Sequence, residues 1–87
     1  MDKNLINKNI TIQNVRADII GELEAIIQYD NHLDVTEDLT AKQTIADIIN
    51  EEKMHVGQLF GLLFHLDPAS KTQFELGYQE FRKSNQQ

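Results

Sequence analysis

The sequence has no cysteine, a single proline and no long hydrophobic run. Without cysteine, the chain can form neither a disulfide framework nor a zinc knuckle, an iron–sulfur site or a rubredoxin-like module. This composition fits a reducing cytosol. The longest nearly apolar stretch, Leu59–Leu66, has eight residues and includes His65, whereas roughly 20 residues are needed to span a bilayer. We therefore expect a cytoplasmic protein without a membrane-spanning helix.

Positive charge is scarce as well. The 87 residues include 8 Lys and Arg against 14 Asp and Glu, which gives a formal net charge of −6. This balance argues against binding to nucleic acid or to anionic membrane surfaces, and it is compatible with binding cations. The first four residues, M-D-K-N, have no apolar run behind a basic region, so no signal peptide is expected.

The length predicts one small domain covering residues 1–87. A chain of this size buries a limited core, and oligomerisation is a common remedy. Residues 1–10 are polar and lack a clear period, so they are predicted to form a flexible arm, and residues 84–87 a frayed tail. Strand-like alternation is absent, and the predicted fold class is all-α.

Helical spacing of apolar residues indicates three helices. The first covers about residues 11–33, the second runs from residues 36–38 to about 66, and the third covers about 68–82. The short connection between the first two is rich in N-cap residues and predicts an antiparallel hairpin. Asp67 is predicted to cap the third helix, with the proline at its first position.

Each of the two long helices carries an apolar seam with steps of three and four residues, interrupted by ionisable groups. The first seam consists of Ile12, Val15, Ile19, Glu22, Ile26, Tyr29 and Leu33. The second seam consists of Ala41, Ile45, Ile48, Glu52, His55, Leu59, Leu62 and Leu66. Ionisable groups in a seam meant for burial carry a desolvation cost unless they are paired or bind a metal.

Other apolar residues widen these faces. The first seam is flanked by Ile20, Leu23 and Ile27. This breadth is typical of a helix in a bundle. The third helix carries three aromatic residues at helical spacing, Phe74, Tyr78 and Phe81. We interpret them as a docking surface.

The ionisable residues that interrupt the two apolar seams are of the types found in metal sites. Glu52 and His55 are three residues apart, so on a helix they share one face and can bind one transition-metal ion together. Glu22 lies about 14 residues before the turn and Glu52 about 16 after it, so a rise of 1.5 Å per residue brings both to the same height. We predict that Glu22, Glu52 and His55 are metal ligands.

Di-iron carboxylate bundles use one Glu from each of two helices and a Glu-x-x-His from each of two others. This chain holds half of that set, so we predict that two copies pair and hold two bridged metal ions. Iron or manganese suits these ligands, and zinc could compete. Dioxygen or peroxide could then oxidise Fe(II). Tyr29, two turns after Glu22, could bond a ligand or donate an electron, or simply pack in the core.

Other interpretations stay open. A Glu-x-x-His pair occurs by chance on many exposed helices, and Glu22 alone could form a structural salt bridge. The chain could then be a non-catalytic helical dimerisation module whose polar seam residues fix the register. His32 and His65 are predicted to lie at the surface, and Glu24 and Glu51 on solvated faces.

The sequence resembles the encapsulated ferritin family, a ferritin-like group related more distantly to rubrerythrins. The matching segments are E-L-E-A-I-I-Q-Y-D-N at residues 22–31, I-N-E-E-K-M-H at 49–55, and D-P-A from Asp67 with the short amphipathic helix that follows. Two positions depart from the family's pattern: Gly21 stands where an acidic residue is frequent, and Gln28 where an aromatic residue is common. The tail K-S-N-Q-Q is not the family's usual encapsulin-targeting extension.

The resemblance implies an antiparallel hairpin with a short C-terminal helix, which dimerises into a ferritin-like four-helix bundle. It implies a ferroxidase that oxidises Fe(II) for iron storage or detoxification inside an encapsulin shell, and a ring of dimers, commonly a decamer. Glu22, Glu52 and His55 would be the di-iron ligands, with two iron ions per dimer interface and Tyr29 nearby. Glu24 would belong to an outer site where metal enters. A rubrerythrin-like peroxidase is the alternative.

Overall fold

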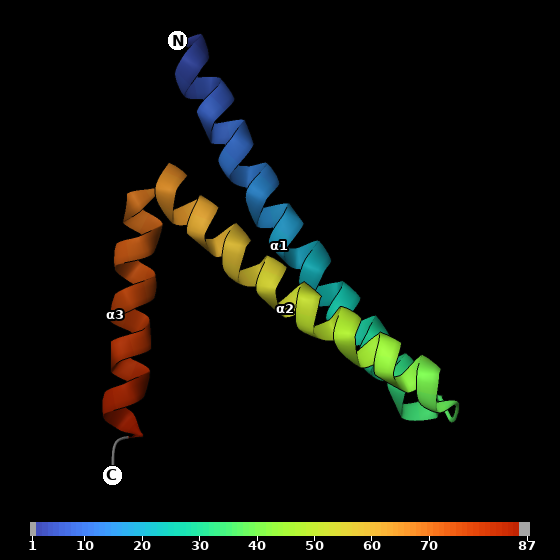
Figure 1. The fold of residues 1–87 in the computed structure, drawn as a ribbon. Coiled ribbons are helices and arrows are strands. Elements are labelled where there is room, and N and C mark those ends of the chain that lie inside the picture. The colour runs from blue at the N-terminus through green and yellow to red at the C-terminus, as the bar shows by residue number, and fades with distance from the viewer. Residues whose placement is uncertain (1, 86–87) are drawn as a thin grey trace.

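The computed structural model describes residues 2–85 and contains three α-helices, α1 (Lys3–Val35), α2 (Leu39–Leu66) and α3 (Pro68–Ser84). The first two run antiparallel to each other, and α3 leaves the end of α2 at a steep angle (Figure 1). No strand occurs in these residues. The predicted all-α class and the hairpin with a short C-terminal helix are therefore confirmed. Within the same residues, no helix is both long and apolar enough to cross a bilayer.

Capping residues explain where α2 begins and why α1 is longer than predicted. The Asp38 side chain accepts a hydrogen bond of 2.9 Å from the Ala41 amide and so caps α2. Asp2 does the same for α1, accepting from the Asn4 amide at 2.9 Å.

The prediction of a flexible arm at residues 1–10 is wrong for residues 3–10, which are helical. Once the buried part of α1 is helical, each further residue adds a backbone hydrogen bond without a new nucleation step, so an exposed extension needs no apolar period. At the other end, α3 ends at Ser84. Residues 86–87 of the predicted frayed tail lie outside the described residues.

The core lies between α1 and α2. Its most buried members are Ile12, Val15, Ile19, Ile49 and Leu63. Of these, all but Ile49 form one cluster, against which the half-buried residues Leu59, Phe60, Phe64 and Leu66 pack. The α1 side of this core follows the predicted first seam. On α2, however, the most buried residues flank the predicted seam, and the seam itself lies at the edge of the contact.

The helices form one thin layer. The described chain measures 55 × 42 × 15 Å and has a radius of gyration of 17.2 Å, whereas a compact domain of this length has about 12 Å. Its accessible surface is 6917 Å², about 1,700 Å² more than the ~5,200 Å² of a compact protein of this mass. Domains usually bury their helices between two layers. A single layer therefore leaves apolar side chains uncovered on both of its faces.

A polar cluster joins α1 to the junction of α2 and α3. Nη2 of Arg16 donates hydrogen bonds to Oδ2 of Asp67 at 3.0 Å and to Oγ of Ser70 at 3.1 Å. The Ser70 hydroxyl in turn donates to Oδ2 of Asp67 at 2.5 Å. Asp67 was predicted to cap α3, but its side chain makes no capping bond to the α3 backbone. Asp67 still occupies the N-cap position of α3, and its carboxylate binds Arg16 and the Ser70 hydroxyl instead.

This cluster predicts a pH-dependent contribution to stability. Hydrogen bonding from Ser70, together with the charge of Arg16, outweighs the opposing effect of partial burial and lowers the pKa of Asp67. A carboxylate whose pKa is lowered by folding stabilises the protein above its unfolded pKa of about 3.9 and loses this effect as the pH falls through the folded value. We expect Asp67→Asn to lower the Tm at about pH 7, and we expect this difference to shrink as the pH falls below the unfolded pKa of about 3.9.

Thermal melts followed by circular dichroism across this pH range would test the expectation. Asparagine is also a good helix N-cap, so the substitution isolates the charge. A Tm difference that stays the same at both ends of the range would contradict the role given to the carboxylate.

Candidate metal centre

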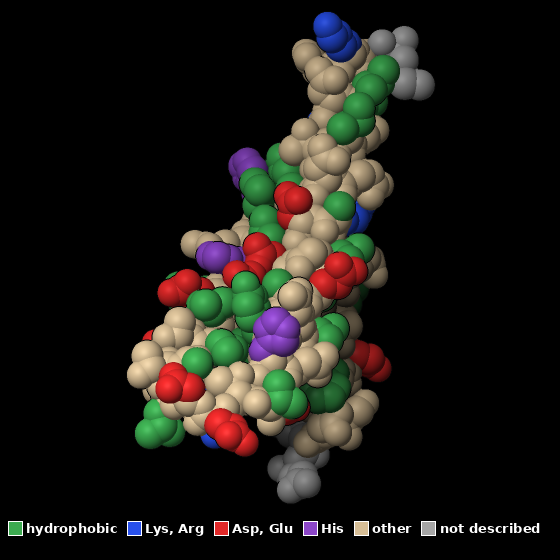
Figure 2. Space-filling view, turned by 90° about the vertical axis from the view of Figure 1, so that its right-hand side faces the viewer, with side chains coloured by type: hydrophobic (Ala, Val, Ile, Leu, Met, Phe, Trp, Pro, Cys, Tyr) green, Lys and Arg blue, Asp and Glu red, His purple; other side chains and the backbone are tan. Residues whose placement is uncertain are grey.

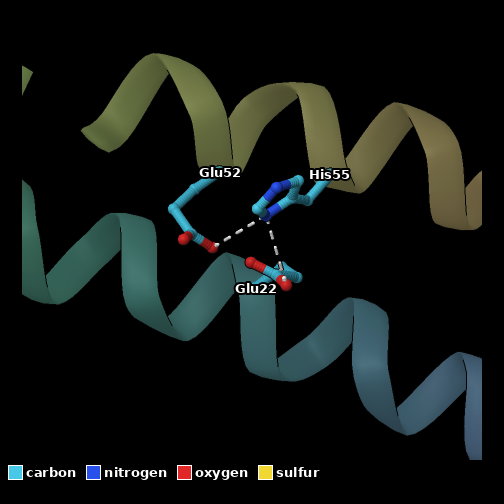
Figure 3. Close-up of side chains that lie close together, drawn as sticks. All are labelled: Glu22, Glu52 and His55. Atoms are coloured by element: carbon cyan, nitrogen blue, oxygen red, sulfur yellow. Dashed lines mark ion pairs between the residues drawn. The ribbon is translucent and has the colours of Figure 1, made fainter. Parts of the chain in front are cut away.

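Three side chains with metal-binding atoms meet between α1 and α2. Glu22 comes from α1, and Glu52 and His55 come from neighbouring turns of α2 (Figure 3). One donor atom from each lies within 4.8 Å of the other two. The hairpin thus brings together the three residues that the sequence predicted to be ligands, because Glu22 and Glu52 are nearly equidistant from the turn. Their role as ligands stays a prediction.

The distances leave room for an ion. Nδ1 of His55 is 3.6 Å from Oε1 of Glu22 and 3.8 Å from Oε2 of Glu52, beyond the usual N–H···O range of about 2.7–3.2 Å. Two donor atoms that each lie ~2.1 Å from one metal are about 3.0 Å apart at a right angle and about 4.2 Å apart on opposite sides. Both spacings between His55 and the carboxylates fall between these values, so they fit a metal ion held by the imidazole together with either carboxylate.

The cluster is partly shielded from solvent and is rich in negative charge. The exposed fraction of the side chain is 19% for Glu52, 27% for Glu22 and 46% for His55. In the part of the chain that the structure describes, neither carboxylate forms an ion pair with a lysine or arginine. The alternative of a structural salt bridge from Glu22 to a basic side chain is therefore not found. Two carboxylates with one imidazole attract a cation.

The cluster opens onto a groove of about 520 Å³ between the two helices. The groove is lined by Ala17, Asp18, Gly21, Glu22, Ala25, Glu52 and Leu59. Three of the α1 residues in this lining are alanine or glycine, and a Cβ added at Gly21 would meet no atom within 4 Å. The ligand set therefore faces open space at the side of the hairpin, and a further side chain or helix can approach it.

This side of the layer, which we call the groove face, differs from the other. Asp18, Glu22 and Ala25 of α1 lie on it because they line the groove. At about 100° per residue, His55 and Leu62 lie on the same side of α2 as the lining residues Glu52 and Leu59. At about 100° per residue, Ile20, Leu23 and Ile27 project on the other side of the buried α1 stripe and form what we call the opposite face. These three residues are 56%, 45% and 61% exposed, and Leu62 on the groove face is 43% exposed. Uncovered apolar side chains are also visible in the space-filling view (Figure 2).

The remaining residues singled out in the sequence lie outside the cluster. Tyr29 is half-buried two turns along α1, and its ring meets that of His32 edge-on, with the centroids 6.3 Å apart. Its part in any chemistry stays a prediction. Glu24 is exposed and does not line the groove. His32, His65 and Glu51 are exposed, as predicted.

One acidic residue of the groove was not singled out from the sequence. Asp18 precedes Glu22 by four residues, one helical turn, and lines the same groove. Its spacing from Glu22 was the available signal. In the sequence, however, an acidic residue four positions before Glu22 looks the same whether it lines a groove or lies on a solvated face. The structure of the hairpin was needed to show which side of α1 is open.

Comparison with known proteins gives two curated relatives, although no family model matches the chain. It is 36% identical over 69 residues to a ferritin-like–encapsulin shell fusion protein of Pyrococcus furiosus, a match that covers 79% of this chain and 20% of the relative. It is 29% identical over 70 residues to the encapsulin nanocompartment cargo protein EncC of Myxococcus xanthus, covering 80% of this chain and 54% of that protein. The chain thus spans about a fifth of the first relative and about half of the second.

A solved structure matches over nearly the whole chain. The crystal structure of an encapsulated ferritin domain from Pyrococcus furiosus superposes with a TM-score of 0.85 and 32% sequence identity, and the match covers 98% of this chain and 93% of that domain. The resemblance read from the Glu22 and Glu52–His55 segments is confirmed. Shared fold, sequence identity and coverage together show that the chain belongs to the encapsulated ferritin family.

Proposed function

We propose that the protein is a ferroxidase that oxidises Fe(II) to Fe(III) at a metal site shared by two copies of the chain. The observation that carries this proposal is the meeting of Glu22, Glu52 and His55 on the groove face, with donor atoms spaced for an ion. No lysine or arginine in the described chain pairs with either carboxylate. The cluster therefore supports a role in binding a cation.

The need for a second copy follows from the ligand count and from the exposed surface. A di-iron carboxylate site takes four Glu and two His, and one chain supplies half of them. The site lies on an open face of a layer only 15 Å thick, beside the exposed Leu62. A second groove face laid against the first would complete two sets of ligands and bury apolar surface. We infer two iron ions per dimer interface, with other divalent metals able to substitute.

The ligands suit the direction of the reaction. Fe(II) is the substrate, and the carboxylates of Glu22 and Glu52 would hold it together with Nδ1 of His55. Anionic oxygen ligands favour Fe(III) over Fe(II), because the Coulomb attraction grows with the charge of the ion. Dioxygen or peroxide would accept the electrons. Tyr29 is proposed as a neighbouring residue that hydrogen-bonds a ligand or donates an electron.

The relatives suggest where the reaction takes place. One is a fusion with an encapsulin shell and the other is a cargo protein of an encapsulin nanocompartment. We infer that this protein also associates with an encapsulin shell and works inside the compartment, where Fe(III) produced by the dimers would be stored. A ring of dimers, commonly a decamer in the family, is part of this proposal.

Anaerobic titration with Fe(II), followed by admission of air, tests the proposal. We expect binding to saturate near one ion per chain, since a six-ligand di-iron site holds about two ions for two chains. Near-ultraviolet absorbance of Fe(III) should then rise in air, and the mass of the assembly should be that of a dimer or a multiple of it. Saturation well below one ion per chain, or no absorbance change in air, would overturn the proposal that the protein is a ferroxidase.

Thermal melting separates the two main alternatives. A metal that binds only the folded assembly raises the Tm by mass action, so the ferroxidase should melt higher with Co(II) than with a chelator. A non-catalytic dimerisation module would melt at the same temperature in both. A rubrerythrin-like peroxidase would bind metal equally well but would oxidise Fe(II) with peroxide much faster than with dioxygen.

A further inference from the structure

Asp18 is an acidic residue of the groove to which the proposed ligand set gives no role. It is exposed and lines the groove together with Glu22 and Glu52. In the described part of the chain it forms no ion pair. In the single chain, before a second copy covers the groove face, its side chain therefore presents an uncompensated charge to the same space that the ligands face.

The surroundings of Asp18 favour a cation in the groove. Asp18 and Glu22 are four residues apart on one helix, a spacing at which two negative charges repel each other. They are separated by about 6 Å along the axis of α1, within the screening distance of about 8 Å at physiological salt. The lining residues around them, Ala17, Gly21 and Ala25, are too short to block the path between them. The charges thus act together on an ion in the groove.

We propose that Asp18 draws Fe(II) into the groove and passes it to Glu22, and that it speeds metal loading without being a ligand in the loaded site. This inference rests on the proposed function, because it names a guiding residue for the same substrate. It also differs from what the family resemblance implied. Glu24, expected at an outer site where metal enters, does not line the groove, whereas Asp18 does.

The rate of Co(II) binding to the full chain tests this role without requiring oxidation. Charged grooves can raise association rates by about 10- to 1,000-fold in total, so we expect removal of one of three carboxylates in Asp18→Asn to slow binding about 2- to 10-fold at ~20 mM salt. Screening should abolish the difference at ~500 mM salt. The amount of Co(II) bound at saturation should not change.

Asp30→Asn is the matched control, because Asp30 is also exposed on α1, does not line the groove and loses the same charge. We expect its binding rate to equal that of the wild type. Equal slowing by Asp30→Asn, no slowing by Asp18→Asn, slowing that salt does not remove, or a lower amount of bound Co(II) would each overturn the inference.

The two proposals can fail separately. Wild-type protein that binds Co(II) but oxidises no Fe(II) would overturn the ferroxidase alone, and the rates of Co(II) binding would still decide the role of Asp18. Wild-type protein that binds no Co(II) would overturn both.

Discussion

Replacing Glu52 with glutamine is expected to reduce Fe(II) binding and oxidation by at least ~100-fold, because even a residue that only orients a metal ligand contributes about 10- to 100-fold. Glutamine keeps the size of the side chain but loses the anionic charge of the carboxylate whose Oε2 lies 3.8 Å from Nδ1 of His55. Equilibrium binding of Fe(II) without oxygen and the initial rate of oxidation in air would measure the two effects.

The neighbouring residue provides the control. Glu51 is exposed on α2 and lies outside the cluster, and Glu51→Gln removes the same charge from the chain. We expect this variant to bind and oxidise iron like the wild type. Without metal, both variants should keep their helical circular dichroism, since Glu52→Gln also relieves repulsion between two carboxylates. If the two variants lose activity equally, or if neither does, Glu52 is not a ligand.

Placing a charge on the groove face is expected to separate the two copies and to abolish metal binding with them. Leu62 is 43% exposed in the single chain and lies two turns beyond His55. If a second copy covers it, Leu62→Asp buries an uncompensated charge, which costs about 3–5 kcal/mol and would weaken the dimer by at least ~100-fold. Sedimentation velocity and Fe(II) binding on the same samples would show whether mass and metal are lost together.

The same substitution on the opposite face should give a different result. Leu23 is 45% exposed, so Leu23→Asp is closely matched in residue type and exposure. We expect this variant to remain a dimer and to keep its full complement of Fe(II), while the assembly of dimers into a larger particle is lost. Loss of iron binding in Leu23→Asp but not in Leu62→Asp would mean that the two chains share metal across the opposite face, which would contradict the proposed dimer.

Much of the fold, and the grouping of Glu22, Glu52 and His55 in the candidate site, could be predicted from the sequence, because both depend on local spacing. Asp67 and the proline after it mark the boundary between α2 and α3 in the sequence itself. Glu52 and His55 share a face by their separation alone. Glu22 joins them because a short turn fixes the height at which two antiparallel helices meet.

What could not be predicted depends on contacts between distant residues or on surfaces that one chain does not cover. Arg16 reaches Asp67 across 51 positions, and no local pattern reports such a pair. The helical extension before Thr11 carries no buried stripe, so its polarity looked like that of an irregular arm. The seam of Glu52 and His55 is only partly covered in the single chain, and the second copy that we propose to cover it leaves no local pattern in the sequence.

The two unlike sides of the layer have a consequence for assembly. A pair that closes over the groove faces still presents an opposite face on each outer side, so every pair carries two free contacts of the same kind. Chains of pairs can then grow end to end, and the angle between successive pairs decides whether they return to their start or continue as an open fibre. In such an assembly, that angle would be set where Ile20, Leu23 and Ile27 meet their counterparts, about a quarter-turn of α1 away from the buried stripe. The size of the finished particle would therefore be tunable by side-chain volume at these three positions, without changing the proposed metal ligands.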